Sequence, residues 1–184
     1  HLGWVDVEGR REALSGGKRL RPTLCLLACE AAGGEWRAAL PAAAAVELVH
    51  NFSLIHDDIQ DGVTERRHRP TVWSLWGLGD GINAGDAMLT LASLAVLRLP
   101  RYGIDPARAL RVVSVLHAAC LRMIEGQHLD LSYERRLDVT VADYLAMIER
   151  KTGALIEAAV ETGALLGTED EAAELANAGR YGLT

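Results

Sequence analysis

The sequence predicts an all-α protein, a bundle of antiparallel helices around a central cavity. Ala, Leu and Val dominate its apolar residues, and aromatic residues make up only 5% of the chain. Ala and Leu are strong helix formers, whereas strands favour β-branched and aromatic residues. The apolar residues also recur at helical spacing, with breaks at Pro and Gly, and do not alternate with polar residues. Composition and spacing therefore indicate helices throughout.

Proline and glycine divide the first half of the chain into helices. Pro22 stands where a first helical turn begins, and the glycine pair at residues 33–34 ends that helix. Pro41 opens a second helix, whose apolar residues keep helical spacing as far as Asp61. A charged loop over residues 62–70 follows.

In the second half, residues 83–99 predict a long helix that Pro100 stops. Asp105 is a candidate N-cap before Pro106, and the helix that starts there is expected to run to about Ser132.

Two capping boxes mark the remaining helices. Thr140 and Asp143 predict a helix over residues 141–166, and a similar box at residues 168–171 opens a last one. Because a glycine inside a helix costs about 1 kcal/mol relative to Ala, we expect a bend near residues 151–153.

Length and charge narrow the functional classes. The chain has 184 residues, the size of one domain, and a net charge of −6. An acidic balance argues against a nucleic-acid-binding protein. Basic residues nevertheless cluster at residues 18–21 and 66–69. Such clusters in an acidic protein suggest a small anionic ligand, with a solvated charged face as the alternative for either cluster alone.

The three cysteines, Cys25, Cys29 and Cys120, form no dense disulfide framework, which indicates a reducing compartment. No further zinc ligands stand near Cys25 and Cys29, so we expect buried thiols. The sequence shows neither a signal peptide nor an apolar stretch long enough to span a bilayer. These features predict a soluble cytoplasmic protein.

The strongest chemical signal is the acidic stretch His56-Asp57-Asp58-Ile59-Gln60-Asp61 at the end of the second predicted helix. Asp57 and Asp61 are four residues apart and share a helical face, where their charges repel each other. Carboxylate oxygens suit Mg²⁺, which also bridges to substrate phosphates. For this motif alone, an acidic surface turn is the alternative.

Cationic motifs on both sides favour the metal interpretation. Arg66 and Arg67 follow the aspartates closely, and paired arginines suit bidentate binding of diphosphate oxygens. Upstream, residues 16–22 read GGKRLRP. Its glycines let the backbone approach a ligand, and its cations enter a helix N-terminus, which favours anions. Together the motifs predict a site for a metal–diphosphate complex.

The chain carries its motifs in a fixed order: GGKRLRP at 16–22, the aspartate-rich stretch at 50–61, RRxxPTVW at 66–73, GQxxD at 126–130 and Lys151-Thr152. This ordered set resembles the trans-prenyltransferase family of isoprenyl diphosphate synthases. The match covers residues 16 to about 165. Any one stretch is moderately specific, whereas the ordered set is highly specific. The resemblance implies an isoprenoid-synthase-type helix bundle and a homodimer.

The resemblance also implies residue roles. Asp57 and Asp61 hold Mg²⁺ against the allylic diphosphate, Asp58 supports them, and Arg66 contacts the same diphosphate. Lys151 joins the three aspartates as a catalytic residue. The implied isopentenyl diphosphate pocket contains Gly17, Lys18, Arg21, His50 and Arg67. Further implied substrate contacts are Gln127, Asp130, Lys151 and Thr152.

The implied reaction condenses isopentenyl diphosphate with dimethylallyl, geranyl or farnesyl diphosphate. The allylic C–O bond ionises, the double bond of isopentenyl diphosphate attacks the cation, and a proton is lost. Mg²⁺ and cationic side chains neutralise the leaving diphosphate. A dry cavity protects the carbocation, and Val46, Val49 and Phe52 are suited to line it.

The resemblance implies that product length depends on bulk at Phe52 and Ser53. Phe52 precedes Asp57 by five residues, roughly 7.5 Å along a helix that rises about 1.5 Å per residue. One aromatic and one small residue resemble the pattern of geranylgeranyl diphosphate synthases, with farnesyl diphosphate as the alternative product. Met123 on a facing helix could override Phe52.

The family carries a second aspartate-rich motif in its C-terminal half, and no such motif is present here. We therefore expect residues 1–184 to be one synthase domain that lacks its C-terminal part. One alternative is a non-catalytic regulatory subunit of a heteromeric prenyl synthase. Less favoured are a class I terpene cyclase and an all-α metal phosphohydrolase, in which His50, His56, Asp57 and Asp61 would bind metal.

Overall fold

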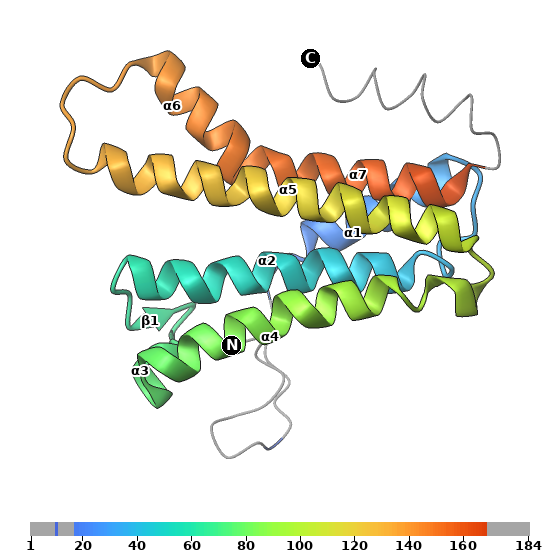
Figure 1. Ribbon diagram of the computed structural model, residues 1–184, viewed down its shortest axis with the longest axis horizontal. Helices are drawn as coiled ribbons and strands as arrows, with labels where there is room; N and C mark the ends of the chain where they lie inside the picture. Colours follow the sequence, from blue (N-terminus) through green and yellow to red (C-terminus); the bar gives the residue numbers. More distant parts are fainter. Residues whose placement is uncertain (1–9, 11–16, 169–184) are drawn as a thin grey trace.

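Helices account for nearly all of the regular structure in the described part of this computed structural model, residue 10 and residues 17–168 (Figure 1). The elements in chain order are α1 (Leu20–Ala31), α2 (Leu40–Gln60), β1 (Glu65–Arg66), β2 (Arg69–Pro70), α3 (Val72–Trp76), α4 (Leu78–Val96), the 3₁₀ helix η1 (Leu99–Tyr102), α5 (Pro106–Tyr133), α6 (Val141–Ile148), the π-helical turn η2 (Glu149–Gly153) and α7 (Ala154–Gly167). The predicted all-α class is confirmed.

Local signals located several helix ends correctly. The Asp105 carboxylate accepts a hydrogen bond from the backbone N–H of Arg108 at 3.2 Å, and α5 ends at Tyr133, one residue beyond the predicted end. Thr140 and Asp143 form the expected capping box. The bend predicted near residues 151–153 is the π-helical turn η2. The predicted capping box at 168–171 lies largely outside the described residues.

The predicted start of the third helix at residue 83 is wrong, because α4 begins at Leu78. The glycines in its first turn favour a loop by propensity. Packing overrides them: a Cβ at Gly81 would lie 2.8 Å from Ile59 Cδ1 and 2.9 Å from Trp73 Cβ, so only a glycine fits there. The short helices α3 and η1 were not predicted.

The helix α2 lies at the centre of the bundle, against α4 on one side and α1 on another. The helix α5 packs along α7 and η2, and α1 also packs against α7 (Figure 1). The core between these helices consists mainly of Ala, Val, Leu and Cys side chains. Cys25, Cys29 and Cys120 are buried free thiols, as expected.

The predicted loop over residues 62–70 contains a small antiparallel hairpin, in which Arg66 pairs with Arg69. Its two turn residues, Arg67 and His68, have φ values of 54° and 62°. Non-glycine residues rarely adopt this left-handed conformation, and such strain tends to occur at functional sites. Among the described helices, none combines the length and apolarity needed to cross a membrane.

Candidate active site

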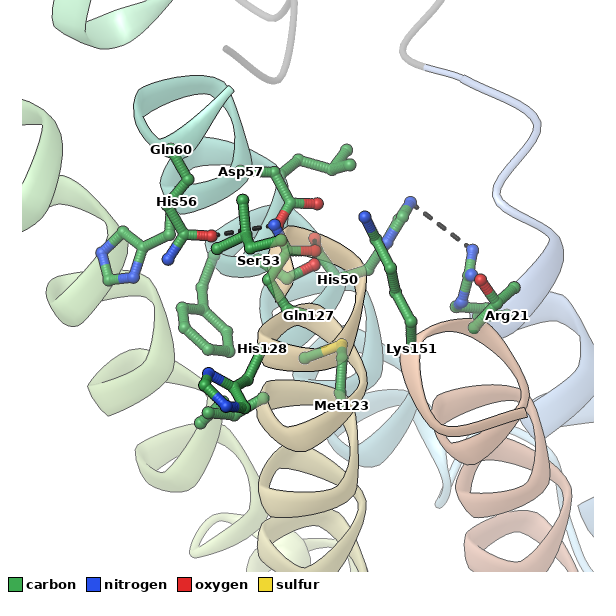
Figure 2. Close-up of a pocket in the computed structure, with 15 residues that line it drawn as sticks. Arg21, His50, Ser53, His56, Asp57, Gln60, Met123, Gln127, His128 and Lys151 are labelled. Atoms are coloured by element: carbon green, nitrogen blue, oxygen red, sulfur yellow. Dashed lines mark hydrogen bonds between the residues drawn. The ribbon is translucent and has the colours of Figure 1, made fainter. Parts of the chain in front are cut away.

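A pocket of about 340 Å³ opens between α2 and α5, with residues of α1 and η2 at its border (Figure 2). This volume falls in the usual range for small-molecule sites, roughly 300–1,000 Å³. The predicted site residues that line it are Arg21, His50, Phe52, Ser53, Asp57, Gln127, Lys151 and Thr152. The structure therefore brings together side chains from motifs that lie far apart in the sequence.

Other predicted site residues do not line the pocket: Gly17, Lys18, Asp58, Asp61, Arg66, Arg67 and Asp130. Several of them contact the lining residues or one another, as described below. Lys18 is exposed.

Asp57 is the partly buried carboxylate of the site. Its pKa is raised to about 6, chiefly by burial and also by the negative charge of Asp61, while the positive charge of Lys151 opposes the rise. Asp61 is exposed at the C-terminal end of α2, where its backbone N–H donates to the Asp57 carbonyl at 2.8 Å. Neither solvent nor the surrounding protein therefore stabilises the negative charge of Asp57 well. A bound cation would stabilise it.

The carboxylate donors of the site suit Mg²⁺. Asp57 and Asp61 offer hard carboxylate oxygens, the ligand type that Mg²⁺ prefers. No cluster of three or more His, Cys, Asp or Glu suited to a metal occurs among the described residues. Water and substrate phosphates, which Mg²⁺ usually keeps as ligands, would fill the rest of its shell.

Asp58 has a role different from that of its neighbours. Only 1% of its side chain is exposed, and its Oδ1 accepts a hydrogen bond from Arg66 Nε at 2.6 Å. Asp58 therefore holds the Arg66 guanidinium on the aspartate side of the pocket. This is a supporting role, carried out through an ion pair.

Arg67 has a different partner from Arg66. Its guanidinium lies against Gly17, where a Cβ would come within 2.6 Å of Arg67 Nη1, and Gly17 also has a positive φ of 62°. The glycine is thus required both by its backbone conformation and by the arginine beside it. The hairpin turn explains how adjacent arginines reach different partners.

His50 and Arg21 form the second cationic border. The Arg21 Nη1 group lies 3.5 Å from His50 Nε2, within hydrogen-bonding distance (Figure 2). The His50 pKa is lowered to about 4, mainly by burial and in addition by the positive charges of Arg21, Arg67 and Arg66. His50 is therefore a neutral imidazole beside cations, able to bind an anion without adding a charge.

Lys151 comes from η2, and Figure 2 shows it pointing toward the side of the pocket that carries Asp57. It donates to the Asp130 carboxylate on α5. A Cβ at Gly126 would overlap the backbone of Lys151, so this glycine lets α5 and η2 approach closely. Gln127, the next residue, donates to Gln60 Oε1 at 2.9 Å and so links α5 to α2.

Phe52 and Met123 close the inner end of the pocket. Both line it, and their exposed fractions are only 5% and 6%. Val49 instead borders a separate hollow of about 10 Å³. Val46 is fully buried in the core, so its expected place in the cavity wall is wrong.

Sequence reasoning gave no site role to several further lining residues: Leu54, Gln60, Ile124, His128 and Leu131. A signal existed for some of them. Gln60 lies three residues after Asp57, and Ile124 and Leu131 lie one turn to either side of Gln127–His128, so each shares a helical face with a predicted site residue. His56, which also lines the pocket, stands in the aspartate-rich stretch and had a role only in the phosphohydrolase alternative.

The phosphohydrolase alternative needs histidines that join the aspartates. His50 contacts Arg21, and His56 turns to α4, where its Nε2 contacts the carbonyl of Ile82. In the described part of the chain the two histidines therefore do not form a metal site with Asp57.

The fold and the site first define a class: an all-helical protein whose pocket brings aspartate carboxylates together with lysine and arginine side chains. A sequence model of the family "Polyprenyl synthetase" matches residues 9–184. The chain belongs to this polyprenyl synthetase family.

Among its relatives is a (2E,6E)-farnesyl diphosphate synthase of Mycobacterium tuberculosis, 48% identical over 168 residues, which cover 90% of this chain and 45% of the relative. A geranylgeranyl diphosphate synthase of Methanosarcina mazei is 50% identical over 161 residues, 87% of this chain and 49% of the relative. The crystal structure of a polyprenyl synthetase from Streptomyces coelicolor A3(2) superposes with a TM-score of 0.85 at 44% identity, over 95% of this chain and 50% of that one. The chain thus spans about half the length of these relatives.

Proposed function

We propose that the protein containing this chain is a Mg²⁺-dependent trans-prenyltransferase, which condenses isopentenyl diphosphate with an allylic diphosphate. One observation carries the proposal: Asp57 and Lys151 line the same pocket as Arg21 and His50. We assign Asp57, Asp61, Arg66 and Lys151 to one anionic subsite, and Gly17, Arg21, His50 and Arg67 to the other. A condensation of two diphosphates needs two anionic subsites, whereas cyclisation of one diphosphate needs one.

In this proposal the aspartate side takes the allylic diphosphate. Asp57 and Asp61 would hold Mg²⁺, which when bound neutralises charge on the leaving diphosphate. Arg66, held by Asp58, and Lys151, freed from Asp130, bind its oxygens. These cations lower the barrier for ionisation of the allylic C–O bond, because they stabilise the charge that develops there.

The other side takes isopentenyl diphosphate. Arg21 and Arg67 bind its phosphates, with Lys18 at the rim, and neutral His50 donates or accepts a hydrogen bond. The double bond of isopentenyl diphosphate then attacks the allylic carbocation, and a proton leaves the new cation. Apolar side chains at the inner end exclude water, which would otherwise quench the cation.

We propose geranylgeranyl diphosphate as the main product, with farnesyl diphosphate as the alternative. Phe52 is bulky and closes the pocket, whereas Ser53 is small and donates to the His50 carbonyl at 2.9 Å. We also propose dimethylallyl, geranyl and farnesyl diphosphate as allylic substrates, a homodimer as the active form, and a cytoplasmic location, which the free thiols favour.

The test is to incubate the full-length gene product alone with labelled isopentenyl diphosphate, each allylic diphosphate and Mg²⁺, and to separate the products by length. We expect Mg²⁺-dependent elongation that EDTA abolishes. Hydrolysis of the diphosphates without elongation would contradict the proposal. Activity that appears only after a second subunit is added would instead support the regulatory-subunit alternative.

A further inference from the structure

His56 is the one aspartate-motif side chain that Figure 2 shows directed from α2 toward α4. Its Nε2 lies 3.2 Å from the backbone carbonyl oxygen of Ile82 and 3.6 Å from Asp86 Oδ1. Because a carbonyl oxygen only accepts hydrogen bonds, Nε2 carries the proton and donates it. His56 therefore links α2 to α4 beside the pocket, and the proposed function gives it no part.

On α4, two glycines one helical turn apart, Gly81 and Gly85, form a notch that receives side chains of α2, with His56 at Gly85 and Ile59 at Gly81. A Cβ at Gly85 would overlap the imidazole ring of His56, and one at Gly81 would lie 2.8 Å from Ile59 Cδ1. Glycine is unfavourable inside a helix, and neither residue has the positive φ that would require it. The space that the two glycines leave for α2 side chains explains their presence.

The His56 ring also contacts the ring of Phe52. The two ring centroids are 5.4 Å apart with an interplanar angle of 82°, an edge-to-face arrangement. Phe52 is 5% exposed and closes the inner end of the pocket with Met123. The ring that ends the cavity is thus held in place by a second ring, and that ring is anchored on α4.

We infer that His56 is a positioning residue for product length: seated against Gly85 in the notch of α4, it fixes the Phe52 ring and so sets the depth of the cavity. The inference rests on the proposed function, since it concerns the chain that grows in the same pocket. It makes product length depend on α4 as well as on the residues of α2 that face the substrate.

Substitutions of His56 and of Gly85 should change the depth of the cavity in opposite directions. In His56→Ala the Phe52 ring loses its support and can move into the vacated space, which deepens the cavity. In Gly85→Ala the new Cβ displaces the imidazole ring toward the pocket, which also contains His56, and the cavity becomes shallower. Gly79→Ala is the matched control on the same helix, because no atom lies within 4 Å of its Cβ position.

The experiment measures the product lengths that the full-length protein and its variants make from isopentenyl and geranyl diphosphate. We expect His56→Ala to shift the main product longer by one isoprenyl unit, Gly85→Ala to shift it shorter, and Gly79→Ala to leave it unchanged. Because His56 acts through Phe52, the double variant with Phe52→Ala should give the same products as Phe52→Ala alone. His56→Gln keeps a donor for the Ile82 carbonyl but lacks the ring, so it should also lengthen the product.

Thermal unfolding of each variant shows which ones fold, and His56→Gln serves if His56→Ala does not. A folded His56 variant with wild-type product lengths overturns the inference, as does a double variant whose products exceed those of Phe52→Ala. A wild type that forms no prenyl diphosphate overturns the proposed function and this inference with it. A wild type that forms them while a folded His56 variant keeps the wild-type product lengths overturns the inference alone.

Discussion

At the scale of single residues, Asp57 is the proposed metal ligand, and its buried charge destabilises the folded protein. Burial and the nearby Asp61 charge both raise its pKa, so without a cation the folded protein tolerates its charge poorly. We expect Asp57→Ala to lower turnover by about 10²–10³-fold, the usual loss when a group that stabilises transition-state charge is removed. The free energy of unfolding without Mg²⁺ should stay equal or rise. Steady-state kinetics and urea unfolding check the two parts, and near-normal turnover would rule out Asp57 as a metal ligand.

Substitutions of Arg66 and Arg67 should have different effects, because the two side chains have different partners. Arg66→Ala leaves buried Asp58 without its ion-pair partner and should cost about 3 kcal/mol of stability, besides weakening allylic diphosphate binding. Arg67→Ala removes an exposed side chain and should change stability by less than about 0.5 kcal/mol. Its main effect should be a higher KM for isopentenyl diphosphate. If only the KM of the allylic substrate changed, the proposed division of roles would be incorrect.

The lowered pKa of His50 predicts how the free energy of unfolding depends on pH. Its pKa is about 4 in the folded protein, against 6.5 for an unperturbed histidine, so between these values the unfolded chain binds a proton that the folded protein does not. Its contribution to stability is therefore complete above pH 6.5 and is lost as the pH falls toward about 4. Urea unfolding across this range should show a smaller loss of stability for His50→Gln than for the wild type. Equal losses would mean that His50 titrates normally.

At the scale of elements, small residues decide how closely helices approach. A Cβ at Gly163 on α7 would overlap the backbone carbonyl oxygen of Cys25 on α1, and Gly167 meets Cys29 in the same way one turn later. The two helices thus pack backbone to backbone, and Gly126 allows a similar approach between α5 and η2. The π-helical turn carries Lys151 into the pocket because α5 leaves this room.

The α1–α7 contact can be tested with a matched pair of glycines. Gly163→Ala should destabilise the protein by about 1–3 kcal/mol, the usual range for overpacking. Gly153→Ala, where the nearest neighbouring atom to the Cβ is Glu149 Cγ at 3.8 Å, should cost nothing and could gain up to about 1 kcal/mol from helix propensity. Thermal or urea unfolding of both variants measures this, and equal stabilities would show that α1 and α7 can separate at little cost.

At the scale of the whole molecule, α4 and α5 leave large apolar side chains in solvent. Leu91 and Leu94 on α4 and Leu121 on α5 are each more than half exposed, at 51%, 51% and 60%. Contiguous exposed apolar patches mark association surfaces, so these leucines are candidates for the proposed dimer surface. We expect the full-length protein to sediment as a dimer at micromolar concentration and Leu94→Glu to shift it toward monomer. A monomer mass for the wild type would remove the homodimer from the proposal.

The sequence by itself determined the fold class, most helix bounds and the family. These follow from signals that lie within a few residues of one another: the Thr140–Asp143 capping box, Pro106 at a helix start, the aspartates on one face of α2. Local propensity failed at the start of α4, where Gly79 and Gly81 favour a loop and packing against Ile59 and Trp73 decides for helix.

Only the tertiary structure decided which side chains meet. It directed Arg66 to Asp58 and Arg67 to Gly17, moved Val46 into the core, and placed His56 between Phe52 and the glycine notch of α4. Gln60 and Gln127 form a hydrogen bond across a separation of 67 residues. Such contacts depend on how helices distant in the chain pack together, and no local pattern of residues encodes that packing.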